Sequence, residues 1–154
     1  MSYKNVIDGL IGVLQTITDF SGGNVTANDY RVLNTGRSQC IVLCPGGFRS
    51  EISTLGGFAS EYWVDWDVII ELYVRYDVTD EIVASRIATY RESVLEAVAT
   101  YPLLKSAPNI LNARIVRGDR PVPVFKPNGE GPIFWLQTSY LTAREDWTSV
   151  TAVE

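Results

Sequence analysis

Two aspartates alternate with tryptophans in the segment 63–67, and a glutamate follows four residues later. On a β-strand, residues two apart lie on one face, so Asp65, Asp67 and Glu71 are expected to lie on the same side of a sheet. Grouped carboxylates bind Mg²⁺ or act as general acid and base. The pattern implies no nucleophile and no third metal ligand. We therefore interpret these residues as the solvated or subunit-facing side of a sheet, with a carboxylate-dependent enzyme as an alternative.

Other residue types that carry out chemistry are scarce. The chain has no histidine, which removes the commonest general base and metal ligand. Cys40 and Cys44 lie about 13 Å apart on an extended strand, and a disulfide needs Cα atoms within about 7 Å, so we interpret both as small buried apolar residues. The glycine pairs 46–47 and 56–57 lack the Lys-Ser/Thr of a phosphate loop and predict turns. We expect no enzyme activity, cofactor or metal.

The charge of the chain limits its partners. The net charge is −5, and only three lysines are present, so broad binding of duplex nucleic acid is not expected. Arg114, Arg117, Arg120 and Lys126 cluster around one long loop. We interpret this cluster as ordinary surface charge, with contact to an anionic partner as the alternative.

The length of 154 residues and the 46% hydrophobic content predict one globular domain. No apolar run has the length of a membrane-spanning helix. The N-terminal stretch is amphipathic and carries Asp8, so we expect no signal peptide and no membrane partner.

The periodicity of apolar residues predicts two helices and several strands. The clearest strand covers 62–76, where the even-numbered residues are apolar and should face the core, and the odd-numbered residues give a polar, partly aromatic face. Pro45-Gly46-Gly47 is expected to end a strand. The predicted helices are 3–20 and 79–100, and the predicted strands are 29–33, 38–44, an irregular 48–53, 62–76, 111–117 and 133–144.

This order of elements predicts an α+β fold, because helices and strands do not alternate. We expect a mostly antiparallel sheet of four to six strands, with 29–33 and 38–44 as a hairpin and both helices packed on one face. The domain should cover 1–144. Residues 118–132, rich in proline and glycine, should form a long loop. Residues 145–154 should form an extended tail.

Several aromatic and charged residues are candidates for an interface, because tryptophan, tyrosine and arginine are enriched in binding hot spots. Trp63 and Trp147 have no evident place in the predicted core, and Phe58 lies in a glycine-rich segment. The long loop supplies further candidates. The predicted interface residues are Trp63, Asp65, Asp67, Phe58, Arg120, Phe125, Lys126 and Trp147.

Taken together, this layout resembles the tail-terminator proteins of long-tailed bacteriophages. The resemblance covers most of the chain and is carried by the N-terminal helix, Tyr30-Arg31-Val32, the strand beginning Trp63-Val64-Asp65, the helix 79–100 and the last strand ending Thr142-Ala143-Arg144. It implies a hexameric ring that caps the tail tube and docks the head connector, with DNA passing through its lumen without sequence-specific binding. It also implies a location in the virion, after assembly in the host cytoplasm.

The length of the loop 118–132 and the glycine-rich segment 46–60 depart from the layout of that family. Two alternatives stay open. The chain is another subunit of a phage neck or connector, or it is a regulatory domain that binds a small ligand between its sheet and helices.

Overall fold

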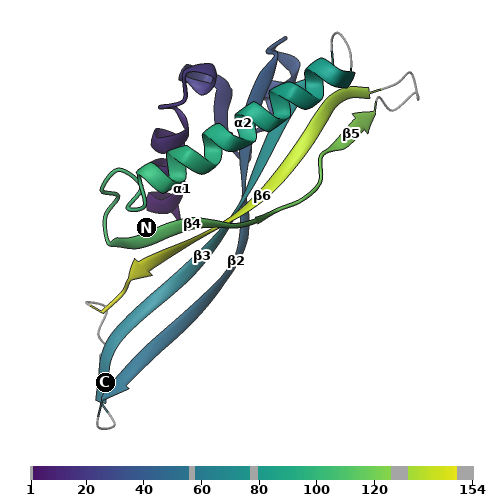
Figure 1. Ribbon diagram of the computed structural model, residues 1–154. Coiled ribbons are helices and arrows are strands. Elements are labelled where there is room, and N and C mark those ends of the chain that lie inside the picture. Colours follow the sequence, from purple (N-terminus) through teal and green to yellow (C-terminus); the bar gives the residue numbers. More distant parts are fainter. Residues whose placement is uncertain (1, 56–57, 77–79, 126–131, 149–154) are drawn as a thin grey trace.

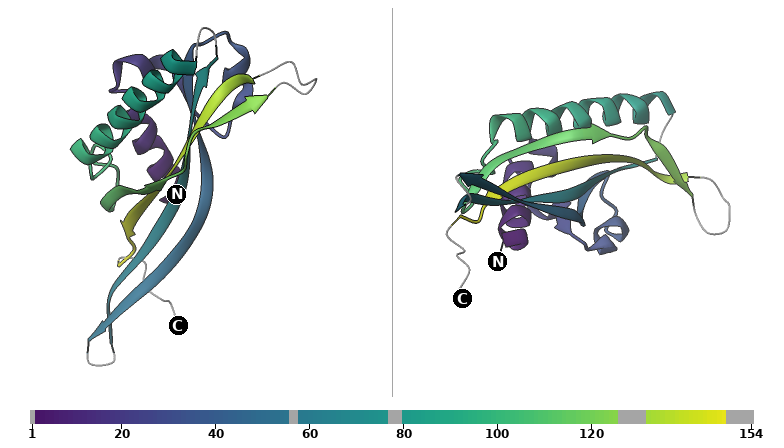
Figure 2. Two further views of the ribbon diagram at one scale, coloured as in Figure 1. Left: turned by 45° about the vertical axis from the view of Figure 1, so that its right-hand side comes forward. Right: turned by 90° about the horizontal axis from the view of Figure 1, so that it is seen from below.

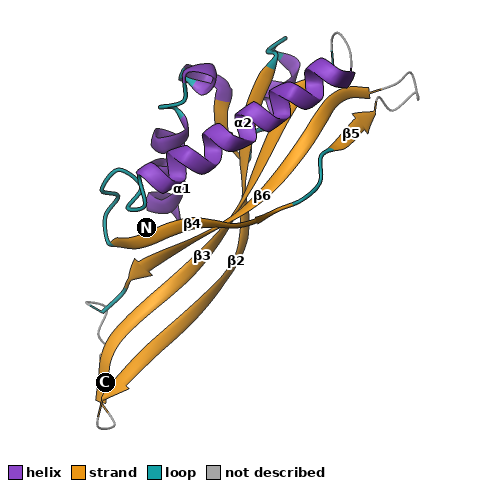
Figure 3. Ribbon diagram, viewed as in Figure 1, coloured by secondary structure: helices purple, strands orange, loops and turns teal. Residues whose placement is uncertain are grey.

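The computed structural model describes residues 2–55, 58–76, 80–125 and 132–148. Its helices and strands, drawn in Figures 1 and 3, confirm the predicted α+β class. In chain order they are α1 (Ser2–Leu14), the short 3₁₀ helices η1 (Thr18–Phe20) and η2 (Gly22–Asn24), β1 (Val25–Ala27), the 3₁₀ helix η3 (Tyr30–Asn34), β2 (Gln39–Leu55), β3 (Phe58–Arg75), α2 (Asp80–Thr100), β4 (Ile110–Gly118), β5 (Val122–Phe125) and β6 (Pro132–Asp146).

The strands of the described residues form one six-stranded sheet in the order β1-β2-β3-β6-β4, with β5 also pairing β6. All neighbouring pairs are antiparallel except β1 and β2, which are parallel. β4 and β5 lie one after the other along the same side of β6. The sheet therefore has two outer edges, one made by β1 and β2 and the other by β4 and β5.

Both helices cover one face of the sheet, as predicted (Figure 2). The apolar residues of α1 and α2 recur every three or four positions, so they share one side of each helix. Leu10 and Ile87 are buried there against Val68 and Ile70 of β3 and Leu141 of β6. The predicted alternation of β3 is confirmed on this face, because its even-numbered apolar residues lie in the core. No helix within the described ranges is long and apolar enough to cross a membrane.

The opposite face of the sheet is partly covered, which the alternation of β3 did not predict. η3 packs there over a second buried cluster that contains Val32, Cys40, Val42, Tyr73 and Phe134. The two cysteines are free and lie on this one face, with Cys40 buried and Cys44 half-buried. Burial raises the pKa of the Cys40 thiol to about 11. The rest of this face, which includes Arg49, Asp65, Asp67, Arg114 and Arg144, is called the open face below.

The hairpin of β2 and β3 is much longer than the rest of the sheet, and its far end projects beyond the helices (Figure 1). The pairing of β3 with β6 stops at Trp63, opposite Asp146. β1 accompanies β2 only along residues 41–43. We call residues 48–55 and 58–66 the arm. Beyond Trp63, the described part of the arm consists of two strands alone.

The predicted strand 29–33 is wrong, and so is its hairpin with 38–44. Residues 30–34 form η3 instead, and on the side away from β3 the strand β2 pairs with the parallel strand β1. The cause is local: Asn28 has a φ of 50°, which turns the chain, and the Asp29 side chain then accepts a hydrogen bond from the backbone N–H of Arg31. This side-chain cap favours a helical turn over an extended strand.

Two predicted element ends also move. The first helix ends at Leu14 rather than at residue 20. Just after Leu14, the hydroxyl of Thr16 donates a hydrogen bond to the carbonyl of Val13 at 2.6 Å, and this bond competes with continuation of the helix. Pro45-Gly46-Gly47 does not end its strand. The register shifts between Pro45 and Phe48, so a β-bulge carries β2 onward into the arm.

The C-terminal third differs in detail from the prediction. The loop predicted at 118–132 contains the edge strand β5, whose one proline, Pro123, is tolerated because only one side of an edge strand is paired. Residues 126–131 lie outside the described residues. β6 continues to Asp146, and Glu145 is buried, so the predicted tail begins later than residue 145.

Candidate interaction surface

Asp65 is buried on the open face rather than solvated, which corrects the sequence-based interpretation. Its side chain is only 5% exposed. Arg144, on the neighbouring strand β6, donates two hydrogen bonds to the carboxylate at 2.9 and 3.0 Å, and Arg49 of β2 approaches at 3.3 Å. The bidentate bond from Arg144 is the main reason that the pKa of Asp65 lies below its usual value. Asp65 is therefore an ionised partner for arginine.

The other two carboxylates that the sequence singled out, Asp67 and Glu71, also have protein partners. Asp67 is exposed and accepts a hydrogen bond from the Thr142 hydroxyl at 2.8 Å. Glu71 accepts bonds from the Tyr30 hydroxyl at 2.5 Å and the Cys44 thiol at 2.9 Å. Burial and the bond to Glu71 both raise the pKa of Cys44, so its thiol stays protonated and donates.

These carboxylates thus bind arginine, hydroxyl and thiol groups, and each has its own donors. Within the described residues, no group of three or more histidine, cysteine, aspartate or glutamate side chains is placed to hold a metal ion.

Trp63 and Trp147 lie on opposite faces of the sheet. The Arg144 guanidinium lies over the Trp63 ring on the open face, 4.7 Å from its centroid. The indole Nε1 of Trp63 is buried without a hydrogen-bond partner in the described structure. Trp147 packs on Trp66 on the helix-covered face, and its indole N–H donates to the carboxylate of Glu145. Only Trp63 of this pair therefore belongs to the open face.

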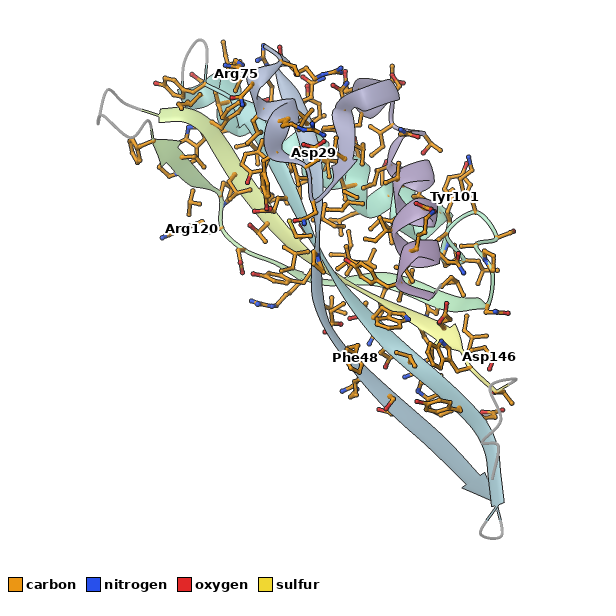
Figure 4. The ribbon with its side chains drawn as sticks, turned by 180° about the vertical axis from the view of Figure 1, so that it is seen from behind. Asp29, Phe48, Arg75, Tyr101, Arg120 and Asp146 are labelled. Atoms are coloured by element: carbon orange, nitrogen blue, oxygen red, sulfur yellow. The ribbon has the colours of Figure 1, made fainter. Side chains whose placement is uncertain are left out.

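An aromatic cluster at the base of the arm escaped the sequence analysis. Phe48 lies on Trp66 with ring centroids 5.6 Å apart, and Trp66 in turn contacts Tyr3 of α1 and Trp147. Phe48 is 70% exposed, and Figure 4 shows it on β2 below the helices. Trp66 is the direct cross-strand partner of Phe48, but the bulge between Pro45 and Phe48 shifts the register of the hairpin, so no spacing in the sequence indicated this contact.

The remaining predicted interface residues lie at the other end of the sheet or cannot be described. Phe125 of β5 is 58% exposed, and Arg120 is exposed in the link between β4 and β5 (Figure 4). Trp63 pairs with the last residue of β6 and Phe125 with its first, so the structure does not bring them together. Phe58 begins β3, and Lys126 lies outside the described residues.

A groove crosses the open face next to the edge strand β4. One part has a volume of about 560 Å³ and is lined by Gly47, Asp67 and Arg117, and an adjoining part of about 440 Å³ is lined by Asn112 and Arg114. Arg117 is held over the Tyr140 ring and bonds to Asp119. Arg114 has no ion-pair partner among the described residues. The predicted basic cluster therefore leaves a guanidinium free at this edge.

The geometry offers two unlike binding edges and no assembled catalytic group among the described residues. One edge is the outer side of the arm, and the other is β4 with its groove. A strand edge carries unpaired backbone N–H and C=O groups that can bind another strand. No protein-family model matches the sequence, and a comparison with curated proteins finds no significant match.

Proposed function

We propose that this protein is a non-catalytic structural subunit that assembles with copies of itself into a closed ring. The projecting arm is the observation that carries this proposal. An isolated two-stranded hairpin is marginal in water, because it has too little apolar surface to bury. The arm nevertheless extends past the end of β6, and an exposed Phe48 lies at its base. A neighbouring subunit would supply the missing contacts.

Ring closure requires two different patches on each subunit, one that binds the preceding copy and one that binds the next. The arm and the β4–β5 edge are two such patches at opposite sides of the sheet. Together with the resemblance noted above, they support the role of a phage tail terminator, a hexameric ring in the virion that caps the tail tube and docks the head connector. Another neck or connector subunit would use the same two patches.

The test is the mass and shape of the purified protein without any ligand. We expect multi-angle light scattering to give a mass about six times that of the chain and negative-stain images to show rings, because both patches are present on every copy. A protein that stays monomeric as its concentration rises would overturn the proposal. A ring with another number of subunits would retain the structural role and exclude the hexamer.

One cavity favours a second candidate function, the binding of a small apolar ligand. It measures about 410 Å³ and lies between α2 and the sheet, lined by Ile87, Ala88, Arg91, Pro121 and Trp135. The indole Nε1 of Trp135 is buried without a hydrogen-bond partner in the described structure. A thermal shift with small apolar carboxylates, in a protein that forms no rings, would favour this function over the structural one.

A further inference from the structure

The direction of the backbone groups along the arm follows from a few hydrogen bonds. On β3, the N–H of Arg75 donates toward β2, to the carbonyl of Ser38 at 2.8 Å. The carbonyl of Tyr62 and the N–H of Tyr76 instead bond toward the β6 side. Since backbone groups alternate along an antiparallel strand, odd-numbered residues of β3 bond to β2 and even-numbered residues bond to β6.

This alternation identifies the free groups on the outer edge of the arm. Ser50 of β2 lies opposite Val64, an even-numbered residue of β3. The pair is therefore not hydrogen-bonded within the hairpin, and the N–H and C=O of Ser50 point outward. β1 ends its pairing at Leu43, so no strand within the described ranges satisfies these groups. Phe48 lies opposite the even-numbered Trp66, so its backbone N–H and C=O also point outward, whereas those of Arg49 point toward β3. The outer edge of the arm therefore carries a row of free backbone donors and acceptors.

The second edge is free over a similar length. The N–H of Ala113 points away from β6, to the carbonyl of Pro102 at 2.7 Å, so the loop after α2 covers the start of β4. From Arg114 to Gly118, the outer side of β4 has no strand partner among the described residues, and Val116 is 48% exposed.

We propose that the outer edge of the arm of one copy adds as an extra strand to the free part of β4 of the next copy. This inference rests on the proposed ring and specifies its interface. β-strand addition supplies affinity through main-chain hydrogen bonds. It also brings opposite charges to one face, because Glu51 of the arm and Arg114 of β4 both lie on the open face of their sheets. Within its own subunit Glu51 has only an exposed ion pair with Arg49, at 3.4 Å, and Arg114 has no ion-pair partner among the described residues. Each subunit then donates an arm and receives one.

Proline at position 50 tests the arm without removing a hydrogen bond of the hairpin. Ser50 is exposed, and its N–H points outward. Ser50→Pro therefore deletes one intersubunit hydrogen-bond donor and places the pyrrolidine group of proline in the path of the added strand. We expect the concentration for half-assembly to rise at least about tenfold, since a lost hydrogen bond that leaves its partner unsatisfied has about that effect. Ser50→Thr keeps the N–H and should assemble like the parent protein.

Lysine at position 116 tests the receiving edge. Val116→Lys places a third cation between Arg114 and Arg117 on β4, and edge lysines oppose strand addition. Leu95→Lys is the matched control, because Leu95 is a similarly exposed apolar residue, 45% exposed, on α2. We expect Val116→Lys to lose ring assembly and Leu95→Lys to retain it, both with the circular dichroism spectrum of the parent protein.

Mixing the two defective variants gives the decisive result. Ser50→Pro copies keep a working β4, and Val116→Lys copies keep a working arm. Below the concentration at which Ser50→Pro assembles by itself, the mixture should therefore form one-to-one dimers and stop, because the remaining edges are both defective. Light scattering and native mass spectrometry report this dimer directly. If the parent protein forms rings and either variant assembles normally, or if the mixture forms no dimer, the edge pairing is wrong while the proposed ring stands. A monomeric parent protein would instead overturn the proposed function.

Discussion

Replacing Arg144 with alanine should lower the free energy of unfolding by about 2–3 kcal/mol, because it leaves the Asp65 carboxylate buried without its main partner. The Asp65 side chain is 5% exposed and that of Arg144 39%, so the expected cost lies at or below the lower end of the range for buried pairs. For a chain of this size, the melting temperature should fall by roughly 5–10 °C. Urea unfolding followed by circular dichroism at pH 7 measures the change.

Arg114→Ala is the matched control for this prediction. Arg114 lies on the same open face and lines the same groove, but it has no ion-pair partner among the described residues. Its removal should change stability by less than about 0.5 kcal/mol. Equal effects of the two substitutions would show that the ion pair with Asp65 contributes nothing specific.

The same ion pair should make stability depend on pH. Its contribution is fully present above the unfolded-state pKa of aspartate, about 3.9, and is lost as the pH falls through the lowered pKa of Asp65 in the folded protein. The difference in stability between the parent protein and Arg144→Ala should therefore be full at pH 7 and shrink as the pH falls below about 4. A difference that stays constant on acidification would contradict the role of the ionised pair.

The sequence predicted those features that depend on long, regular periodicity. The alternation along β3 correctly placed Val68, Ile70 and Leu72 in the core, and the apolar stripe of α2 predicted a helix at 79–100 that the structure has at Asp80–Thr100. In both cases the pattern repeats over fifteen or more residues, so one misleading residue does not change the outcome.

The features that sequence analysis missed depend on a partner distant in the chain or on a single side-chain bond. The burial of Asp65 requires Arg144, 79 residues later, and nothing local to Asp65 indicates that pairing. The five residues of η3 are too few to separate alternation from a helical turn, and the cap from Asp29 decided between them. Tyr73 is buried on the face that was expected to be polar, because η3 packs over it. The wrong prediction of a strand at 29–33 therefore also made the prediction for that face wrong.

Gly46→Ala should have the second large effect, through the bulge that sets the path of the arm. A Cβ at Gly46 would lie 2.8 Å from the carbonyl oxygen of Asp67 and 2.9 Å from its Cβ. Both atoms belong to β3, which is paired on both sides, so the backbone has little freedom to move away. We expect a loss of about 2–3 kcal/mol in the free energy of unfolding, the upper range for overpacking, measured by urea unfolding.

Gly47→Ala is the matched control, since the added Cβ would meet only the Asp67 carboxylate oxygen, at an ordinary 3.9 Å. Its cost should stay below about 1 kcal/mol. Because the bulge lies between the body of the sheet and the arm, a Gly46→Ala protein that relieves the contact by shifting β2 also redirects the arm. Its rings should then form at higher concentration than those of Gly47→Ala. Equal stability and equal assembly of the two variants would mean that the close approach of Gly46 to Asp67 does not position the arm.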